Sequence, residues 1–433
     1  MKSLLALAGL FFVQCVCALE IHIDAGYDEQ TKIAIVPFGT ADDSDDISDI
    51  VAFDLARSGQ FDPLASENML SYPTHPDEVF FRDWRILGTE YLVIGRVHRE
   101  ATGDLGVRYY LYDVFNERQL ASRDVRGGPD ALRDLAHRVA DDVFEATTGI
   151  RGAFSTKILY VLAQNLGTSY VRFKLEIADS DGERTRTLFE SSEPMLSASW
   201  SPDGRRVAYV SFETGRTAIY VQDVEGGARE RIAEYPGINS APVFSPDGGR
   251  LAMVLSRDGN PEIYIMDLAT RKLRRITRYP SAIDTEPSWT KDGNGLIFTS
   301  DRGGRPQIYQ VDLSTLLVER LTFQGDYNAR ARLLPDGKHL VYVHRRNDVY
   351  HIAWQDLERD DVRVLTETSL DESPSLAPNG TMLIYATQDR GRGILAVVSI
   401  DGRVKYRLPS SAGDVREPAW SPYLDGNSAA SGY

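Results

Sequence analysis

A six-residue phrase recurs through the last two-thirds of the chain at a nearly constant interval. One clear copy is Ser-Trp-Ser-Pro-Asp-Gly at residues 199–204, and a degenerate copy precedes it at residues 153–155. Successive copies are separated by 43 to 45 residues, and the last copy, at residues 419–422, is truncated. The third residues of the copies are Ser201, Ser245, Thr290, Leu334, Ala377 and Ser421. Repeats of this length that encode several short strands are typical of the blades of a β-propeller.

Each repeat encodes four strands. The phrase ends the first strand, and Pro-Asp-Gly then forms a tight turn, because Pro fixes φ and Gly accepts a positive φ. Three β-branched or aromatic runs follow, such as residues 207–210 and 219–221. The chain contains seven first-strand phrases but six sets of three following strands. This mismatch predicts six blades, with residues 416–420 completing the blade that begins near residue 157. A seven-bladed ring is the alternative, in which one blade would lack three strands.

The N-terminus predicts export. Met1 and Lys2 are followed by an apolar run over residues 4–13 and by small residues that end at Ala18, which is the pattern of a signal peptide. We expect residues 1–18 to be cleaved. Both cysteines of the chain lie within this segment, so the mature protein would contain none and would depend on its core rather than on disulfides.

The charge of the chain argues against two classes of binding partner. The formal net charge is −15, which disfavours nucleic acid and docking on anionic lipid. No segment after the signal peptide is apolar over a length that spans a bilayer, so we expect no membrane insertion.

Residues 19–150 lack the repeat and predict a separate α/β domain. Its expected elements are strands near residues 32–38, 91–94 and 107–114 and helices over residues 46–58 and 129–148. Pro129 lies near the start of the last helix and Gly149 just after its end. The propeller would then occupy residues 151–424, followed by a short tail at residues 425–433.

Motifs for catalysis are missing from the chain. It contains neither the Gly-x-Ser-x-Gly of α/β-hydrolases nor the His-Glu-x-x-His of metalloproteases, and no glycine-rich phosphate loop. The acidic run at residues 42–46 precedes a predicted helix and is better explained as a helix cap than as a calcium loop. We therefore expect no catalytic residue, no cofactor and no metal.

Polar residues gather directly before the first strands of the repeats. The segments are Asn-Ser-Ala-Pro at 239–242, Asp-Thr-Glu-Pro at 284–287, Asp-Glu-Ser-Pro at 371–374 and Arg-Glu-Pro at 416–418. In a propeller these loops emerge on one face around the channel mouth, which predicts either a docking funnel for a protein or a cation site. The alternative is ordinary strand-entry chemistry, copied from blade to blade.

Several longer stretches resemble the TolB family, the periplasmic propeller component of the Tol–Pal system of Gram-negative bacteria. The stretches are Ile-Asp-Ala-Gly-Tyr-Asp at 23–28, Thr-Gly-Ile-Arg-Gly-Ala-Phe at 148–154, and residues 370–382 and 419–424. The resemblance covers residues 19–424. It implies an α/β N-terminal domain joined to an all-β six-bladed β-propeller, in agreement with the repeat, and a periplasmic location.

The resemblance also implies a non-catalytic scaffold with two partners, supporting outer-membrane integrity and cell division. It implies that the mature N-terminus, residues 19–32, binds TolA by adding a strand to a sheet edge, chiefly through Leu19, Glu20, Ile21, His22, Ile23 and Asp24. It implies that the propeller mouth binds the peptidoglycan-associated lipoprotein, Pal, through Asn239, Ala241, Thr285 and Glu286. Glu372 and Glu417 occupy corresponding positions and extend this expected ring. We expect a monomer that also contacts other envelope proteins.

A second hypothesis is a secreted propeller enzyme or a carbohydrate-binding module. Propeller domains of prolyl-oligopeptidase-like peptidases carry similar repeats, so the repeat alone does not exclude this class. The missing nucleophile motif and the missing hydrolase domain count against it.

Overall fold

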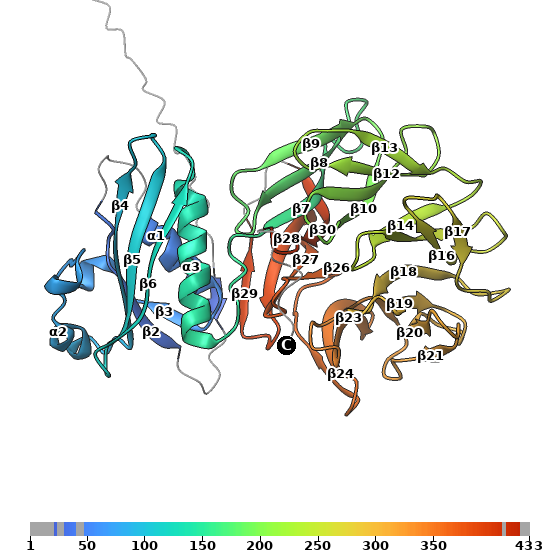
Figure 1. Cartoon of the computed structure of the whole chain (residues 1–433). Coiled ribbons are helices and arrows are strands. Elements are labelled where there is room, and N and C mark those ends of the chain that lie inside the picture. Colours follow the sequence, from blue (N-terminus) through green and yellow to red (C-terminus); the bar gives the residue numbers. More distant parts are fainter. Residues whose placement is uncertain (1–20, 24–29, 40–46, 409–412, 425–433) are drawn as a thin grey trace, which may run out of the picture.

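The computed structural model describes residues 21–23, 30–39, 47–408 and 413–424. The N-terminal domain contains a five-stranded sheet in the order β3-β2-β4-β5-β6 (Figure 1). Its strands are β2 (Thr31–Ile35), β3 (Phe61–Pro63), β4 (Tyr91–Arg99), β5 (Leu105–Asp113) and β6 (Arg118–Gly127). Strand β2 is parallel to β3 and β4, whereas β5 runs antiparallel to its two neighbours, β4 and β6.

Helices cover both faces of this sheet because its central strands alternate two apolar sets. Ile33 and Val93 face α1 (Ile47–Arg57) and α3 (Leu132–Thr148), whereas Ala34 and Leu92 face α2 (Phe81–Ile86) and its buried Trp84. Two 3₁₀ turns, η1 (Ser66–Asn68) and η2 (Pro76–Glu78), precede α2. The predicted α/β domain is confirmed.

The last helix of this domain ends as its sequence predicts. Pro129 precedes the N-cap of α3, and Gly149 follows its last residue with a φ of 74°, a left-handed conformation that Gly adopts without a Cβ clash. Only eight residues separate the end of α3 from the start of the propeller at Lys157. Helix α3 therefore lies between the sheet and the propeller (Figure 1).

In the described part of the chain, the propeller has six antiparallel sheets, or blades, which confirms the predicted number. Blade 1 contains β30 (Asp414–Trp420), β7 (Lys157–Gln164), β8 (Arg172–Asp179) and β9 (Arg186–Ser191). Blade 2 contains β10 (Met195–Trp200), β11 (Arg206–Ser211), β12 (Ala218–Asp223) and β13 (Arg229–Ala233). Blade 3 contains β14 (Asn239–Phe244), β15 (Arg250–Leu255), β16 (Glu262–Asp267) and β17 (Leu273–Arg275).

The remaining three blades follow the same pattern. Blade 4 contains β18 (Asp284–Trp289), β19 (Gly295–Ser300), β20 (Gln307–Asp312) and β21 (Val318–Arg320). Blade 5 contains β22 (Asn328–Leu333), β23 (His339–Arg346), β24 (Val349–Asp356) and β25 (Asp361–Val364). Blade 6 contains β26 (Glu372–Leu376), β27 (Met382–Asp389), β28 (Arg392–Ser399) and β29 (Val404–Arg407).

The ring closes through the end of the chain. Strand β30 pairs antiparallel with β7, with Arg416 opposite Val161 and Trp420 opposite Ile158, so the predicted closure is confirmed. The Trp420 indole Nε1 also donates a hydrogen bond to Thr156 Oγ1 over 2.8 Å. This pairing leaves no open edge on β7.

A short N-terminal strand extends blade 6. Strand β1 (Ile21–Ile23) pairs antiparallel with β29, with Ile21 opposite Tyr406. The segment expected to bind a partner is thus docked as a fifth strand on the blade, whereas Thr31 and Lys32 already belong to β2. The expected signal peptide, the acidic run at 42–46 and the tail at 425–433 lie outside the described residues.

Candidate functional site: the mouth of the propeller

A bulge interrupts the innermost strand of every blade at the same point of the repeat. The bulged residue lies four positions before the third residue of the repeated phrase, and its φ is between 46° and 56°. In the six blades these residues are Ser197, Ala241, Glu286, Arg330, Ser373 and Glu417. At each of these points the pairing with the second strand shifts, as between Ser240 and Val243. Bulges re-aim side chains, and all six residues line one central cavity of about 300 Å³.

Within this ring, one arginine holds two glutamates. Arg330 Nε donates to Glu286 Oε1 over 2.6 Å, and Arg330 Nη1 donates to Glu417 Oε1 over 3.0 Å. The same guanidinium donates to Ser373 Oγ. Burial alone would lower the pKa of Arg330, but Glu417 and Glu286 outweigh burial, and its pKa is raised. Blades 1, 4, 5 and 6 are therefore linked across the channel by one charged network.

Exposed apolar side chains surround this polar ring. In three of the blades, an exposed apolar residue lies seven positions before the third residue of the repeated phrase. These residues are Ile238, Ile283 and Leu370, which are 44%, 50% and 50% exposed. These residues precede the innermost strands, so they lie at the end of the channel opposite the Pro-Asp-Gly turns. We call these three residues the apolar collar. A polar centre with an apolar collar on a rigid scaffold is suited to binding a protein.

The residue after each collar position anchors the loop that carries it. Asn239 is fully buried, its Oδ1 accepts from Tyr235 N over 2.8 Å, and its Nδ2 donates to Tyr235 O over 2.7 Å. The corresponding buried polar residues are Asp284, Asn328 and Asp371. Asn239 therefore lies at the mouth, but its side chain is buried and is hydrogen-bonded within the loop beneath the collar.

The other expected contact residues lie close to the mouth. Ala241, Glu286 and Glu417 belong to the ring itself. Thr285 is partly exposed beside Glu286 on β18, and Glu372 is partly exposed at the start of β26, in an adjoining cavity. The structure thus brings all six expected positions to one end of the channel, with the Asn239 side chain buried there.

The expected TolA-binding residues are only partly covered by the structure. Ile21, His22 and Ile23 form β1, whereas Leu19, Glu20 and Asp24 lie outside the described residues. The backbone pairing of β1 with β29 shows that this segment is able to add to a sheet edge.

Three ring members were not predicted: Ser197, Arg330 and Ser373. The predicted positions are polar residues close to a Pro, whereas Arg330 is followed by Ala331. A fixed offset from the repeated phrase would have found all six, because the bulge position keeps a spacing of four residues in every repeat.

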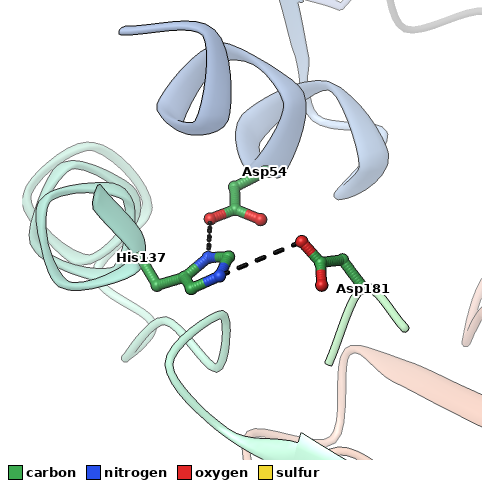
Figure 2. A group of neighbouring side chains, drawn as sticks. All are labelled: Asp54, His137 and Asp181. Carbon is green, nitrogen blue, oxygen red and sulfur yellow. Dashed lines mark hydrogen bonds and ion pairs between the residues drawn. The ribbon is translucent and has the colours of Figure 1, made fainter. Parts of the chain in front are cut away.

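A second cluster of titratable groups lies between the two domains (Figure 2). His137 on α3 has Nδ1 2.6 Å from Asp54 Oδ2 on α1, and its Nε2 lies 3.9 Å from Asp181 Oδ2 in the turn that follows β8. Three such groups could hold a metal ion. However, Arg57 Nε already donates to Asp54 over 2.9 Å, and Arg133 donates to Asp181.

Electrostatics favour an ion-pair network over a metal site. Burial alone would lower the pKa of His137, but the neighbouring Asp54, Asp179 and Asp181 outweigh burial and raise its pKa to about 9. A protonated imidazole has no lone pair for a metal, so at neutral pH the cluster acts as a bridge between domains. Arg57 extends this bridge, since its Nη2 donates to Ser180 Oγ of the propeller over 2.8 Å.

Comparison with known proteins identifies the family. Residues 19–120 match the model of the TolB amino-terminal domain, and residues 144–424 match that of the TolB beta propeller domain. The Tol-Pal system protein TolB of Pseudomonas aeruginosa is 56% identical over 408 residues, which cover 93% of this chain and 94% of that protein. The protein of the same name from Pseudomonas entomophila is 53% identical and covers 97% of this chain and 99% of its own length.

A solved structure agrees with the sequence relatives. The crystal structure of TolB from Acinetobacter baumannii has 44% sequence identity and a TM-score of 0.86, covering 94% of this chain and all of that one. In the described part of the chain, no helix combines the length and the apolar character needed to cross a membrane. From its two matching domains, its relatives and its six closed blades, the chain belongs to the TolB family of the Tol–Pal system.

Proposed function

We propose that this chain is a non-catalytic periplasmic scaffold that binds Pal at the propeller mouth and TolA through its mature N-terminus. In this role it supports outer-membrane integrity and envelope constriction during cell division. The observation that carries the proposal is the apolar collar of Ile238, Ile283 and Leu370 around a ring of rigidly held polar side chains. Membership of the Tol–Pal system supports the choice of Pal as the occupant.

The geometry of the mouth supports binding rather than catalysis. The two ring carboxylates, Glu286 and Glu417, are already bound by Arg330, and the pairing fixes their positions across the channel. Such side chains offer a preorganised surface, which lowers the ordering cost of docking. Collar residues that become fully buried on docking would be the energetic hot spots.

The N-terminal strand supports the proposal for TolA. β1 adds to blade 6 only through β29, and no strand pairs with its other edge in the described part of the chain. A segment of three paired residues is held weakly, so it is available for exchange onto the edge of a partner sheet.

Calorimetric titration with Pal tests the mouth. Ala241→Arg should abolish docking through a steric clash at the ring, and Ile238→Ser should weaken it by about 2 kcal/mol if the collar is a hot spot. Lys291→Glu is the matched control, because this exposed residue lies on the turn face at the other end of the channel. Wild-type affinity in both mouth variants, with unchanged thermal melts, would place Pal elsewhere.

Binding of TolA is tested by a single change in the backbone. Ile21→Pro removes a backbone donor that strand addition requires, so it should reduce TolA binding without altering the rest of the fold. Calorimetry with Pal serves as the control, since Pal affinity should stay within error. Unchanged TolA affinity in this variant would contradict the assignment of the N-terminal strand.

A further inference from the structure

A second cavity, of about 270 Å³, opens beside the channel between blades 5 and 6. We call it the side pocket. It is lined by residues from β22, β23 and β24 and by the segments that enter β22 and β26. Its lining includes Tyr327, Arg330, Tyr350, Leu370 and Glu372. Glu286 of the neighbouring blade 4 also lines it.

The side pocket contains a carboxylate without a direct partner. In the described part of the chain, the Glu372 side chain makes no hydrogen bond and no ion pair. Burial raises the pKa of Glu372, and the attraction of Arg330 and Arg416 offsets this only in part. Arg330 is not available to Glu372 as a direct partner because it already binds Glu286 and Glu417. A partly buried carboxylate in this position is stabilised by an incoming cation.

Two aromatic rings stand beside this carboxylate in the pocket. Tyr327 and Tyr350 contact each other edge to face, with ring centroids 5.2 Å apart and an interplanar angle of 83°. Aromatic faces attract cations, and planar guanidinium groups also stack on them. Leu370, half exposed at the pocket edge, can pack against the methylene groups of a long side chain.

The charges around the side pocket sum to a negative field. Arg330 is matched by the two glutamates that it binds, so Glu372 is attracted only at longer range, by Arg330 and by Arg416. The neighbouring Asp371 is buried, and its carboxylate accepts hydrogen bonds from Thr366, Thr368 and Thr387 rather than facing the pocket alone. The pocket therefore combines net negative charge, aromatic faces and an apolar edge in one cavity.

We propose that the side pocket binds an arginine side chain presented by the protein that docks at the propeller mouth, and this assignment rests on the proposed function. The guanidinium pairs with Glu372, lies against Tyr327 or Tyr350, and its methylene stem packs on Leu370. Arginine is favoured over lysine because its planar fork matches both a carboxylate and an aromatic face, whereas an ammonium is a strongly hydrated point charge.

Ligand-detected NMR with N-acetylarginine methylamide tests the side pocket without any protein partner. The wild-type chain should bind this probe at least about tenfold more tightly than the neutral citrulline analogue, because the charge-assisted pair is lost in the latter. It should also prefer the arginine probe to the lysine analogue. Equal binding of the citrulline analogue, or preference for the lysine analogue, would overturn the assignment.

Two variants and one control locate the probe. Glu372→Gln keeps the shape of the side chain and should reduce binding about tenfold, and Tyr350→Leu should also reduce it. Glu319→Gln, at an exposed position of the outer strand of blade 4, should leave binding unchanged. Unaltered binding in Glu372→Gln would refute the side pocket as the site.

Calorimetry with Pal separates this proposal from the function on which it rests. If Pal binds wild-type chain and Glu372→Gln equally, the side pocket is not used and the docking function stands. If wild-type chain binds the arginine probe but not Pal, the docking function fails and the side pocket stands. Parallel loss of probe and Pal binding in Glu372→Gln supports both.

Discussion

The stability of the domain junction should depend on the protonation of His137. The pKa of this residue is raised from 6.5 to about 9, chiefly because Asp54 outweighs the effect of burial. Each pKa unit is worth about 1.4 kcal/mol, so the protonated form is favoured in the folded protein by on the order of 3 kcal/mol. This contribution is fully present below pH 6.5, the unfolded value, and is lost as the pH rises through about 9.

Urea unfolding between pH 6 and pH 10 measures this contribution. The free energy of unfolding of the wild-type chain should fall across the window from 6.5 to about 9, relative to that of His137→Gln, by on the order of 3 kcal/mol. The variant should be less stable at pH 6 and should approach the wild-type chain above pH 9. At low pH the opposite sign applies to Asp54, whose lowered pKa makes its contribution disappear as the carboxylate is protonated.

A matched control isolates the buried histidine. His75 is also close to an acidic residue, Asp77, but its side chain is 47% exposed, so His75→Gln should change the free energy of unfolding far less than His137→Gln does. Parallel pH profiles for the wild-type chain and His137→Gln would refute the argument. They would mean that the imidazole has the same proton affinity in the folded and unfolded chains.

Three further outcomes follow from the packing. Deleting residues 414–424 exposes the edge of β7 and should abolish the cooperative thermal transition of the propeller measured by circular dichroism; a melt like that of the full chain would disprove the closure. Arg330→Met should lower the free energy of unfolding in urea by about 3 kcal/mol, because it leaves Glu286 and Glu417 without their partner. Adding Glu286→Gln and Glu417→Gln to this variant should restore most of the lost stability, and no recovery would contradict the charge network. Gly59→Ala should lower Tm, because φ at Gly59 is 75° and the added Cβ would lie 1.9 Å from the Val404 side chain of β29. Gly103→Ala is the control, since its Cβ would meet no neighbour and Tm should fall less. Equal decreases in Tm would exclude the contact with β29.

The repeat made the propeller predictable from the sequence, because each blade carries its own copy of the turn and of the strands around it. The counts of first-strand phrases and following strands were enough to predict the pairing of β30 with β7. Strand β6 was missed because residues 118–127 are mostly polar and partly exposed, so no alternation marks them. Helix α2 was missed because it has six residues and buries only Trp84.

The site was harder to predict than the fold because it depends on backbone conformation. A bulge at a non-glycine residue is not marked by any residue type. Ala241 and Arg330 differ in side chain but share the same left-handed backbone conformation. The burial of Asn239 likewise depends on a loop that turns back on itself. Residue type pointed to the segments that enter the innermost strands, whereas the bulges in those strands determine which side chains line the cavity.

The closure by β30 has a consequence for biogenesis. The strand that completes blade 1 lies at the far end of the sequence from β7, with 249 residues between Gln164 and Asp414. A chain emerging from its N-terminus would carry β7 with one unpaired edge until β30 had appeared. The propeller should therefore fold late and slowly, as expected for contacts between residues distant in sequence, and during that interval it would need protection from edge-to-edge aggregation.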